Sequence, residues 1–208
     1  MNYSICVSGA AGGRTVAEDK VLAAAVGQEI ARQGHVLTTG ATVGLPYYAA
    51  KAAHQAGGTS IGFSPAVNIR EHLHKYRLPI GVYDFVNYTG MHYLGRDVYL
   101  VQSSDAVITI GGRTGSLHEL STAIEARRVC GILTGSDGLA DFVTTILDKL
   151  EVGHRKLFIF DDDPKRLVDK VVAALDKEYA DIDIKDELAH WYLDSDEPNK
   201  PIGRSHTG

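Results

Sequence analysis

Residues 110–119 read Ile110-Gly111-Gly112-Arg113-Thr114-Gly115-Ser116-Leu117-His118-Glu119, and they connect an apolar strand pattern at 106–110 to an apolar helical pattern that begins at Leu117. A strand that ends in glycines and opens a helix makes an anion site. The first backbone N–H groups of the helix have no partner within it, and the helix dipole adds partial positive charge there. The stretch therefore predicts a phosphate-binding turn, which we assign to Gly111, Gly112, Arg113, Thr114, Gly115 and Ser116.

The same stretch allows two interpretations of Ser116 and Glu119. Ser116 can be the N-cap of the helix, with Glu119 at the third helical position as in a capping box. In the second interpretation the turn holds a phosphate, and Glu119 acts chemically beside it. The local sequence leaves both interpretations open.

The composition is ordinary for a globular protein. The chain has 208 residues, of which 44% are hydrophobic and 23% are charged, and chains of about this size commonly share one core. We predict one domain over 1–180 and a polar tail or arm over 181–208. The formal net charge is -5, without a long basic run. This disfavours nucleic acid as a partner, because neutralising phosphates needs clustered Lys and Arg.

Metal, membrane and export signals are missing from the sequence pattern. Cys6 and Cys130 lie in apolar strand-like runs and have no CxxC or Cys/His spacing, so we expect buried thiols and no metal site. The chain opens on a strand pattern without the basic and apolar regions of a signal peptide. No apolar stretch reaches the roughly 18 residues that cross a bilayer. We therefore expect a cytoplasmic protein without a membrane partner.

Strand and helix patterns alternate along the chain. Strands are expected at 4–8, 35–39, 59–63, 82–86, 106–110, 129–133 and 156–160, and helices at 16–33, 45–56, 91–103, 139–150 and 164–175, besides the one after the glycine turn. An irregular connection is expected at 66–79. This order predicts a single doubly wound α/β domain, with a mostly parallel sheet and helices on both faces. Such sheets bind ligands at the carboxyl ends of their strands, so the turns at 9–13, 40–44 and 111–116 should share one crevice.

Two common nucleotide motifs do not fit. The turn Gly9-Ala10-Ala11-Gly12-Gly13-Arg14-Thr15 superficially suggests a Walker A loop, but its glycine spacing is one residue short and Arg14 stands where the lysine belongs. A dinucleotide GxGxxG is absent from every strand–helix junction. ATPase and NAD-dehydrogenase functions are therefore disfavoured.

Five segments in order carry a resemblance to a known family over about residues 4–150. The first is the initial strand with Ser8-Gly9. The second and third are Thr39–Pro46 followed by 49–53, similar to the family's GGxxGLMG element and helix, and 57–65, similar to its GGxVIGIxP strand. The fourth and fifth are Met91-His92 with Arg96, near the position of its MHxRK segment, and 112–119, which corresponds to its GGxGTxxE motif. On these segments the chain resembles the Lonely Guy (LOG) nucleotide phosphoribohydrolases and their relatives. The relatives include proteins mislabelled lysine decarboxylases and the molybdenum-cofactor carrier proteins.

Three departures from the family pattern concern the phosphate site. Arg113 replaces the second glycine of GGxGTxxE, where glycine permits positive φ and close approach of the backbone to phosphate. An arginine can instead contact the phosphate or fill the site. Gly111 replaces the usual proline, and MHxRK would place its arginine at Leu94 rather than at Arg96. The phosphate-site sequence is closer to the carrier-like branch.

The resemblance implies a Rossmann-like nucleotide-binding domain that splits the N-glycosidic bond of a nucleoside 5′-monophosphate into free base and ribose 5-phosphate. Glu119 would stabilise positive charge at ribose C1′ or guide the attacking water. Arg96 would hold the phosphate or a ribose hydroxyl, or orient Glu119. The backbone of 112–116 would bind the phosphate, and the turns that contain Gly9, Gly40 and Gly44 would wall the base. The implied reaction needs no metal or cofactor.

A non-catalytic carrier or sensor is the alternative. It would use the same crevice to hold a nucleotide-like ligand, such as a pterin cofactor or a signalling nucleotide. Arg113 favours this alternative and Glu119 favours the enzyme. The family precedent also implies a homodimer or homotetramer, and we expect the 185–193 segment, with Trp191 and Tyr192, to pack near its interface.

Overall fold

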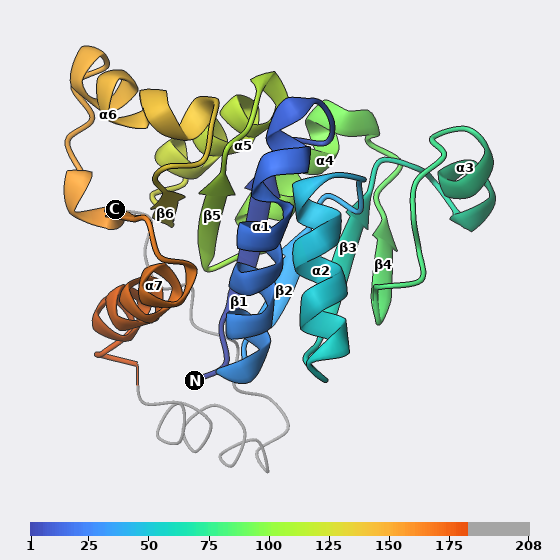
Figure 1. Ribbon diagram of the computed structural model, residues 1–208, viewed down its shortest axis with the longest axis horizontal. Helices are drawn as coiled ribbons and strands as arrows, with labels where there is room; N and C mark the ends of the chain where they lie inside the picture. Colours follow the sequence, from blue (N-terminus) through green and yellow to red (C-terminus); the bar gives the residue numbers. More distant parts are fainter. Residues whose placement is uncertain (183–208) are drawn as a thin grey trace, which may run out of the picture. The chain divides into compact units, whose positions relative to one another are not determined.

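We describe a computed structural model of the protein over residues 1–182. The chain divides into two units, Met1–Leu175 and Asp176–Gly208. The first unit contains the whole sheet and the candidate site (Figure 1). The segment 185–193, with Trp191 and Tyr192, lies outside the described residues.

Strands and helices alternate through the described chain. The strands are β1 Ser4–Gly9, β2 Val36–Thr39, β3 Ser60–Ser64, β4 Phe85–Tyr88, β5 Ala106–Ile110, β6 Val129–Leu133 and β7 Phe158–Asp161. The helices are α1 Arg14–Arg32, α2 Leu45–Gln55, α3 Ile69–His74, α4 His92–Gln102, α5 Thr114–Glu125, α6 Leu139–Lys149 and α7 Pro164–Glu178, with a 3-10 turn η1 at Arg155–Leu157. This alternation is the pattern expected from the sequence.

The strands form one parallel sheet in the order β4-β3-β2-β1-β5-β6-β7. The chain builds outward from β1 to β4, then returns to the other side of β1 with β5 and builds outward again. Figure 1 shows α1 and α2 on one face of the sheet and α4 and α5 on the other. The predicted doubly wound α/β fold is therefore confirmed.

The direction of winding reverses between β1 and β5, and this is where such sheets bind ligands. Gly9 pairs with Ile110 in the parallel register, so the two strands end side by side. The turns that follow them must therefore lie next to each other. Thr39, at the end of β2, belongs to the neighbouring strand on the other side of β1.

The centre of the sheet is apolar on both faces. Every residue of β5 and β6 is buried, as expected for central parallel strands covered by helices on each side. Ile108 and Ile132 are fully buried. This core fixes the ends of β1 and β5, and through them the turns at the carboxyl edge.

The helices of the described part are short or amphipathic. α1 is the longest, at 19 residues, and buries Ala23, Val26 and Ile30 while exposing Glu18 and Lys20. Within residues 1–182, no helix combines the length and the apolar character needed to cross a membrane.

The strand expected at 82–86 is placed differently, because β4 begins at Phe85. The residues before it form a turn, in which the backbone N–H of Tyr83 donates to the carbonyl of Ile80 at 3.2 Å. The apolar Val82 is buried without belonging to a strand. An apolar residue in a buried turn gives the same local signal as one in a strand.

The connection expected to be irregular at 66–79 contains the short helix α3. Asn68 caps it, because its side chain accepts a hydrogen bond from the backbone N–H of Glu71 at 2.9 Å. His72 is buried within this helix and contacts the hydroxyl of Ser64 at 2.8 Å. The helix is six residues long, too short for apolar periodicity to reveal it.

A close helix crossing holds α1 against α2. A Cβ at Gly27 of α1 would lie 2.8 Å from the Cα of Ala49 in α2, well inside normal contact. The crossing brings backbone against backbone, and only glycine fits there.

We expect Gly27→Ala to destabilise the protein by about 1–3 kcal/mol, because overpacking this crossing outweighs the better helix propensity of alanine. Gly81→Ala is the matched control, since a Cβ at Gly81 meets no heavy atom of the described residues within 4 Å. Urea unfolding of the two variants measures the difference. Equal midpoints for both variants would contradict the assigned crossing.

Candidate functional site

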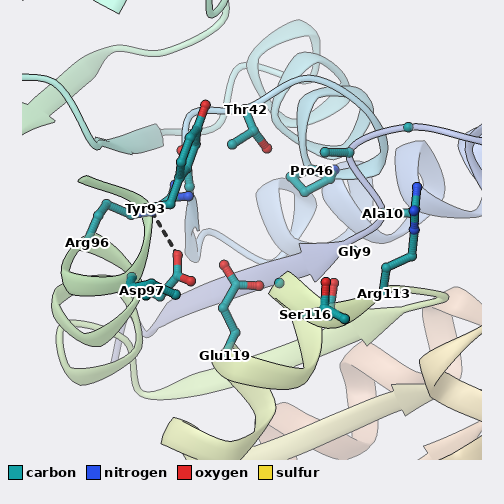
Figure 2. Close-up of a pocket in the computed structure, with 16 residues that line it drawn as sticks. Gly9, Ala10, Thr42, Pro46, Tyr93, Arg96, Asp97, Arg113, Ser116 and Glu119 are labelled. Carbon is teal, nitrogen blue, oxygen red and sulfur yellow. Dashed lines mark hydrogen bonds and ion pairs between the residues drawn. The ribbon is translucent and has the colours of Figure 1, made fainter. Parts of the chain in front are cut away.

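A cavity of about 320 Å³ opens at the carboxyl edge of β1, β2 and β5. The three small-residue turns all contribute to it, with Gly9 from the first, Gly40 from the second and 113–116 from the third. α4 closes the remaining side with Tyr93, Leu94, Arg96 and Asp97 (Figure 2). The crevice expected from topology is therefore confirmed.

Most of the site residues chosen from the sequence line this cavity: Gly9, Gly40, Arg96, Arg113, Thr114, Gly115, Ser116 and Glu119. Gly44, Gly111 and Gly112 are not among the lining residues. They hold the turns in shape without lining the cavity, as the contacts described below show.

The helix α5 begins at Thr114 rather than after Ser116, so the interpretation of Ser116 as the N-cap, one of the two left open by the sequence, is wrong. Arg113 occupies the cap position, and the first helical hydrogen bond runs from the N–H of Leu117 to its carbonyl at 2.9 Å. Positive φ at Gly111 (54°) and Gly112 (108°) turns the chain early enough for the helix to start there. The capping-box interpretation of Glu119 fails with it, because Glu119 lies beyond the first helical turn.

Arg113 fits its position without strain. Its φ of -136° is extended, so this turn does not need a glycine there. The side chain is exposed, and Figure 2 shows it at the end of the cavity opposite Tyr93. The N–H groups of the first turn of α5 have no helical partner and open toward the same space. An anion at this end would meet a cationic side chain and a helix N-terminus together.

Three predicted glycines hold the turns in shape. The N–H of Gly111 donates to the hydroxyl of Ser136 at 2.8 Å, and the carbonyl of Gly112 accepts from the N–H of Leu139 at 3.0 Å. These bonds attach the turn at 111–116 to the residues at and just before the start of α6. At Gly44, a Cβ would lie 2.5 Å from the Cα of Ala11, so glycine allows the first and second turns to pack together.

Glu119 projects from α5 toward the end of β1. Its side chain accepts a short hydrogen bond from the hydroxyl of Ser8, and only 9% of the residue is exposed. Burial and, to a smaller extent, the nearby charge of Asp97 raise the pKa of Glu119 to about 7, against the lowering effects of Arg96, the Ser8 hydroxyl and His118. Glu119 therefore changes protonation near neutral pH, as a catalytic acid or base requires.

Arg96 connects α4 to the ends of two strands. Its guanidinium donates to the carbonyl oxygens of Gly40 and, at 3.0 Å, of Phe63. Its Nε lies 2.9 Å from the carboxylate of Asp97, and Arg96 is only 4% exposed. A Cβ at Gly40 would lie 2.6 Å from the guanidinium carbon, which explains the glycine. Most of the donor capacity of Arg96 is therefore used within the protein.

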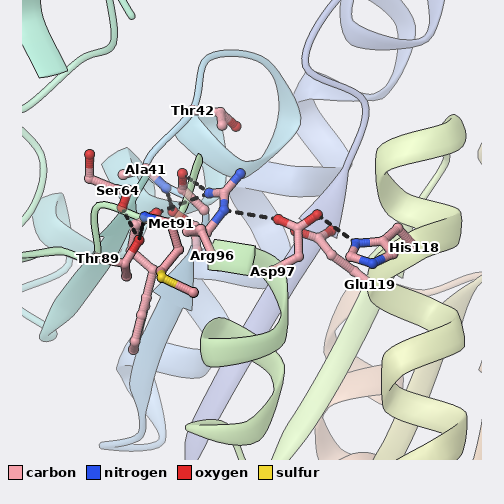
Figure 3. A network of polar contacts seen from close by, with 12 residues as sticks. Ala41, Thr42, Ser64, Thr89, Met91, Arg96, Asp97, His118 and Glu119 are labelled. Atoms are coloured by element: carbon pink, nitrogen blue, oxygen red, sulfur yellow. Dashed lines mark hydrogen bonds and ion pairs between the residues drawn. The ribbon is translucent and has the colours of Figure 1, made fainter. Parts of the chain in front are cut away.

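Asp97 was missed in the sequence. It is buried between two cationic or ionisable partners, with the Nε of Arg96 on one side and the Nδ1 of His118 at 3.0 Å on the other. Figure 3 shows the three side chains in a row beside Glu119. A sequence signal existed, because Asp97 lies on the buried face of α4 with Leu100 and Val101. An acid on an apolar face needs a partner.

Metal binding has no support in the described part of the chain. Among residues 1–182, no group of three or more His, Cys, Asp or Glu side chains is arranged to hold a metal ion. The thiols of Cys6 and Cys130 are both buried, and burial raises the pKa of Cys130 to about 12. Cys6 and Cys130 are therefore not poised as thiolate ligands.

The sequence profile of the SLOG cluster4 family matches residues 2–168. An uncharacterized protein of Archaeoglobus fulgidus is 34% identical over 108 residues, which are 51% of this chain and 66% of that protein. The chain thus covers slightly less than two thirds of that relative.

Two solved structures are similar over most of their length. The molybdenum cofactor binding protein from Rippkaea orientalis is 27% identical, with a TM-score of 0.69 over 84% of this chain and 98% of that chain. The Moco carrier protein from Chlamydomonas reinhardtii is 25% identical, with a TM-score of 0.68 over 86% of this chain and 99% of that chain. The fold thus has counterparts among proteins described as binding or carrying the molybdenum cofactor.

Proposed function

The chain belongs to the SLOG cluster4 family of LOG-like proteins, and on this premise we propose that it hydrolyses the N-glycosidic bond of a nucleoside 5′-monophosphate. The products are the free base and ribose 5-phosphate. One observation carries the proposal. A buried carboxyl, Glu119, with its pKa raised to about 7, shares a cavity with the open N-terminus of a helix.

The phosphate is assigned to the N-terminus of α5. The backbone N–H groups of Thr114, Gly115 and Ser116 lie in the first helical turn and line the cavity, and the exposed guanidinium of Arg113 stands beside them. Helix N-termini bind phosphate through such N–H groups and the helix dipole. Anchoring the phosphate here places the ribose toward Glu119, about one helical turn further along α5.

The chemistry is assigned to Glu119. Cleavage develops positive charge at C1′ and on the ring oxygen, and a carboxylate beside the ribose stabilises that charge. The same carboxylate accepts a proton from the water that attacks C1′, while the departing base nitrogen takes a proton from solvent as its bond to C1′ breaks, and Glu119 then releases its own proton to solvent. A pKa near 7 lets Glu119 take up and return the proton in each turnover.

Arg96 is assigned a positioning role. Its guanidinium is occupied by two backbone carbonyls and Asp97, so we assign phosphate binding to Arg113 and the α5 backbone. Arg96 holds α4 against the ends of β2 and β3 and lowers the pKa of Glu119 through its charge. Its effect on the reaction passes through the shape and the charge of the cavity.

A cofactor or nucleotide carrier is the second candidate. The observation that favours it is the likeness, at 25–27% identity, to two proteins described as binding or carrying the molybdenum cofactor. The same helix N-terminus and cavity would then hold a pterin phosphate without cleaving it. In a carrier, Glu119 would have no chemical task.

Incubation with a panel of purine and pyrimidine 5′-monophosphates should release free base from at least one of them. The matching nucleosides should remain intact, because phosphate binding at α5 positions C1′ against Glu119. Chromatography of base and ribose 5-phosphate is the measurement. Binding of a nucleotide without release of any base would support the carrier and overturn the hydrolase.

A further inference from the structure

We infer that the α4 end of the cavity is an aromatic stacking subsite built on Tyr93, which selects ligands that carry a planar heterocycle opposite their phosphate. The inference rests on the proposed function, because it assigns the second end of the same cavity. Tyr93 lies in the first turn of α4, lines the cavity and is 45% exposed. Figure 2 shows its ring at the same end of the cavity as Thr42 and at the end opposite Arg113.

The ring of Tyr93 is held in place without a ligand. The ring of Tyr76 meets it edge-on, with centroids 5.4 Å apart and planes at 88°. The guanidinium carbon of Arg96 lies 5.7 Å from the centroid of Tyr93. The hydroxyl of Tyr76 is itself 2.8 Å from the Nδ1 of His92. A pre-ordered ring loses little freedom when a second ring stacks on it, which favours binding.

The backbone conformation at the start of α4 also indicates a preformed binding site. His92 has a φ of 54°, in the left-handed region that non-glycine residues seldom occupy. Such positions occur at binding sites when the surrounding structure holds them. Here the Nδ1 of His92 lies 2.8 Å from the hydroxyl of Tyr76, and the next residue in the chain, Tyr93, lines the cavity.

The cavity is polar at one end and aromatic at the other. Arg113 and the open N-terminus of α5 lie at the first end, Glu119 lies between the ends, and Tyr93 lies at the second (Figure 2). Beside Tyr93, the lining residues Thr42, Pro46 and Leu94 are uncharged. The charged Arg96 and Asp97 also line this side of the cavity, but they pair with each other, and the guanidinium of Arg96 also donates to two backbone carbonyls. Phosphate, sugar and ring follow one another in the same order in a nucleoside monophosphate.

Stacking on an aromatic face depends on planarity and area more than on the pattern of hydrogen bonds. A two-ring heterocycle should therefore bind more tightly than a single ring. A purine nucleotide and a pterin phosphate share this chemistry, so the subsite serves either of the two proposed functions. Comparing the affinities for the two ligand types shows which of them the subsite selects.

The test measures binding by calorimetry in the full chain carrying Glu119→Gln, which prevents loss of the ligand. Adding Tyr93→Ala should weaken AMP binding by roughly 5- to 100-fold, on the scale of losing one stacked base, and change ribose 5-phosphate binding by less than about twofold. Tyr93→Phe should retain AMP binding. Tyr99→Ala is the matched control, because Tyr99 lies on the same helix, is 52% exposed and does not line the cavity.

The outcomes separate the subsite from the reaction. Weaker AMP binding in Tyr93→Ala alone supports the subsite, even when wild type releases no base and the hydrolase is thereby refuted. Equal AMP affinity in Tyr93→Ala and Tyr99→Ala overturns the subsite and leaves the hydrolase standing if base is released. AMP binding no tighter than ribose 5-phosphate in the parent also overturns it. If a pterin phosphate binds more tightly than AMP, the result supports the subsite and favours the carrier function.

Discussion

Glu119→Gln is expected to lower turnover of the best nucleotide by roughly 100-fold or more, the scale of losing one electrostatic stabiliser, while nucleotide binding stays nearly intact. Glutamine keeps the size of the side chain and can still accept a hydrogen bond from Ser8. It cannot carry the negative charge that stabilises positive charge at C1′, and it cannot accept a proton. The loss should therefore appear in kcat rather than in KM.

Steady-state rates of base release measure this effect. Glu125→Gln is the matched control, since Glu125 lies at the exposed end of the same helix and should behave as wild type. In wild type, kcat/KM should rise with pH through about 7, as Glu119 becomes a carboxylate. Unchanged turnover in Glu119→Gln would leave Glu119 without a chemical role and refute the mechanism.

The same carboxyl makes stability depend on pH. Its pKa is about 7 in the folded protein against a reference of 4.5, so the folded state holds the proton more tightly than the unfolded state. The free energy of unfolding should fall as pH rises from 4.5 to 7 and stay low above that range, with a total effect of about 3 kcal/mol.

Glu119→Gln removes this titration. Its stability relative to wild type should rise between pH 5 and pH 8, and denaturant unfolding at the two pH values measures the change. Parallel pH dependence in the two proteins would show that the carboxyl is not buried as described. The predicted difference would instead show that the activity of Glu119 and its cost to stability share one physical origin, the burial of an ionisable group.

Arg96→Ala is expected to destabilise the protein by about 3–5 kcal/mol, the scale of removing one partner from a buried ion pair. The change leaves the buried Asp97 without its guanidinium and the carbonyls of Gly40 and Phe63 without that donor. Because α4 is then no longer held to the ends of β2 and β3, nucleotide binding and turnover should weaken together.

Thermal and denaturant unfolding measure the stability of this variant. Arg14→Ala is the control, because the ion pairs of Arg14 involve a side chain that is 78% exposed, and exposed pairs contribute little. Arg96→Lys should fall between wild type and alanine, since lysine keeps the charge but not the forked geometry. Stability of Arg96→Ala equal to that of the control would contradict the assigned network.

The sheet was predictable because its determinants are local. Apolar runs such as Ala106–Ile110 and Val129–Leu133 are buried on both faces and need no alternation, and the glycine turns mark their ends. The start of α5 was not predicted, although its glycines were. Positive φ at Gly111 and Gly112 sets the helix start, whereas the capping interpretation placed that start after Ser116.

The residues of the candidate site could be predicted only where they lie together in one continuous segment of the chain. Glu119 and the residues around Arg113 follow a strand end directly, so their place at the crevice comes from topology. Ser8 and Glu119 are separated by 111 residues, and their contact depends on how α5 packs across β1. Asp97 and Tyr93 reach the cavity through the position of α4. The apolar face of α4 indicated that Asp97 needs a partner, but the local pattern could not identify that partner or place the helix.

A crystal structure of Glu119→Gln soaked with AMP tests the central claim most directly. The account predicts the phosphate against the N–H groups of Thr114, Gly115 and Ser116, ribose C1′ beside the side chain at position 119, and the adenine ring on Tyr93. AMP found only elsewhere, with the Arg113 side chain filling the open end of α5, would contradict it.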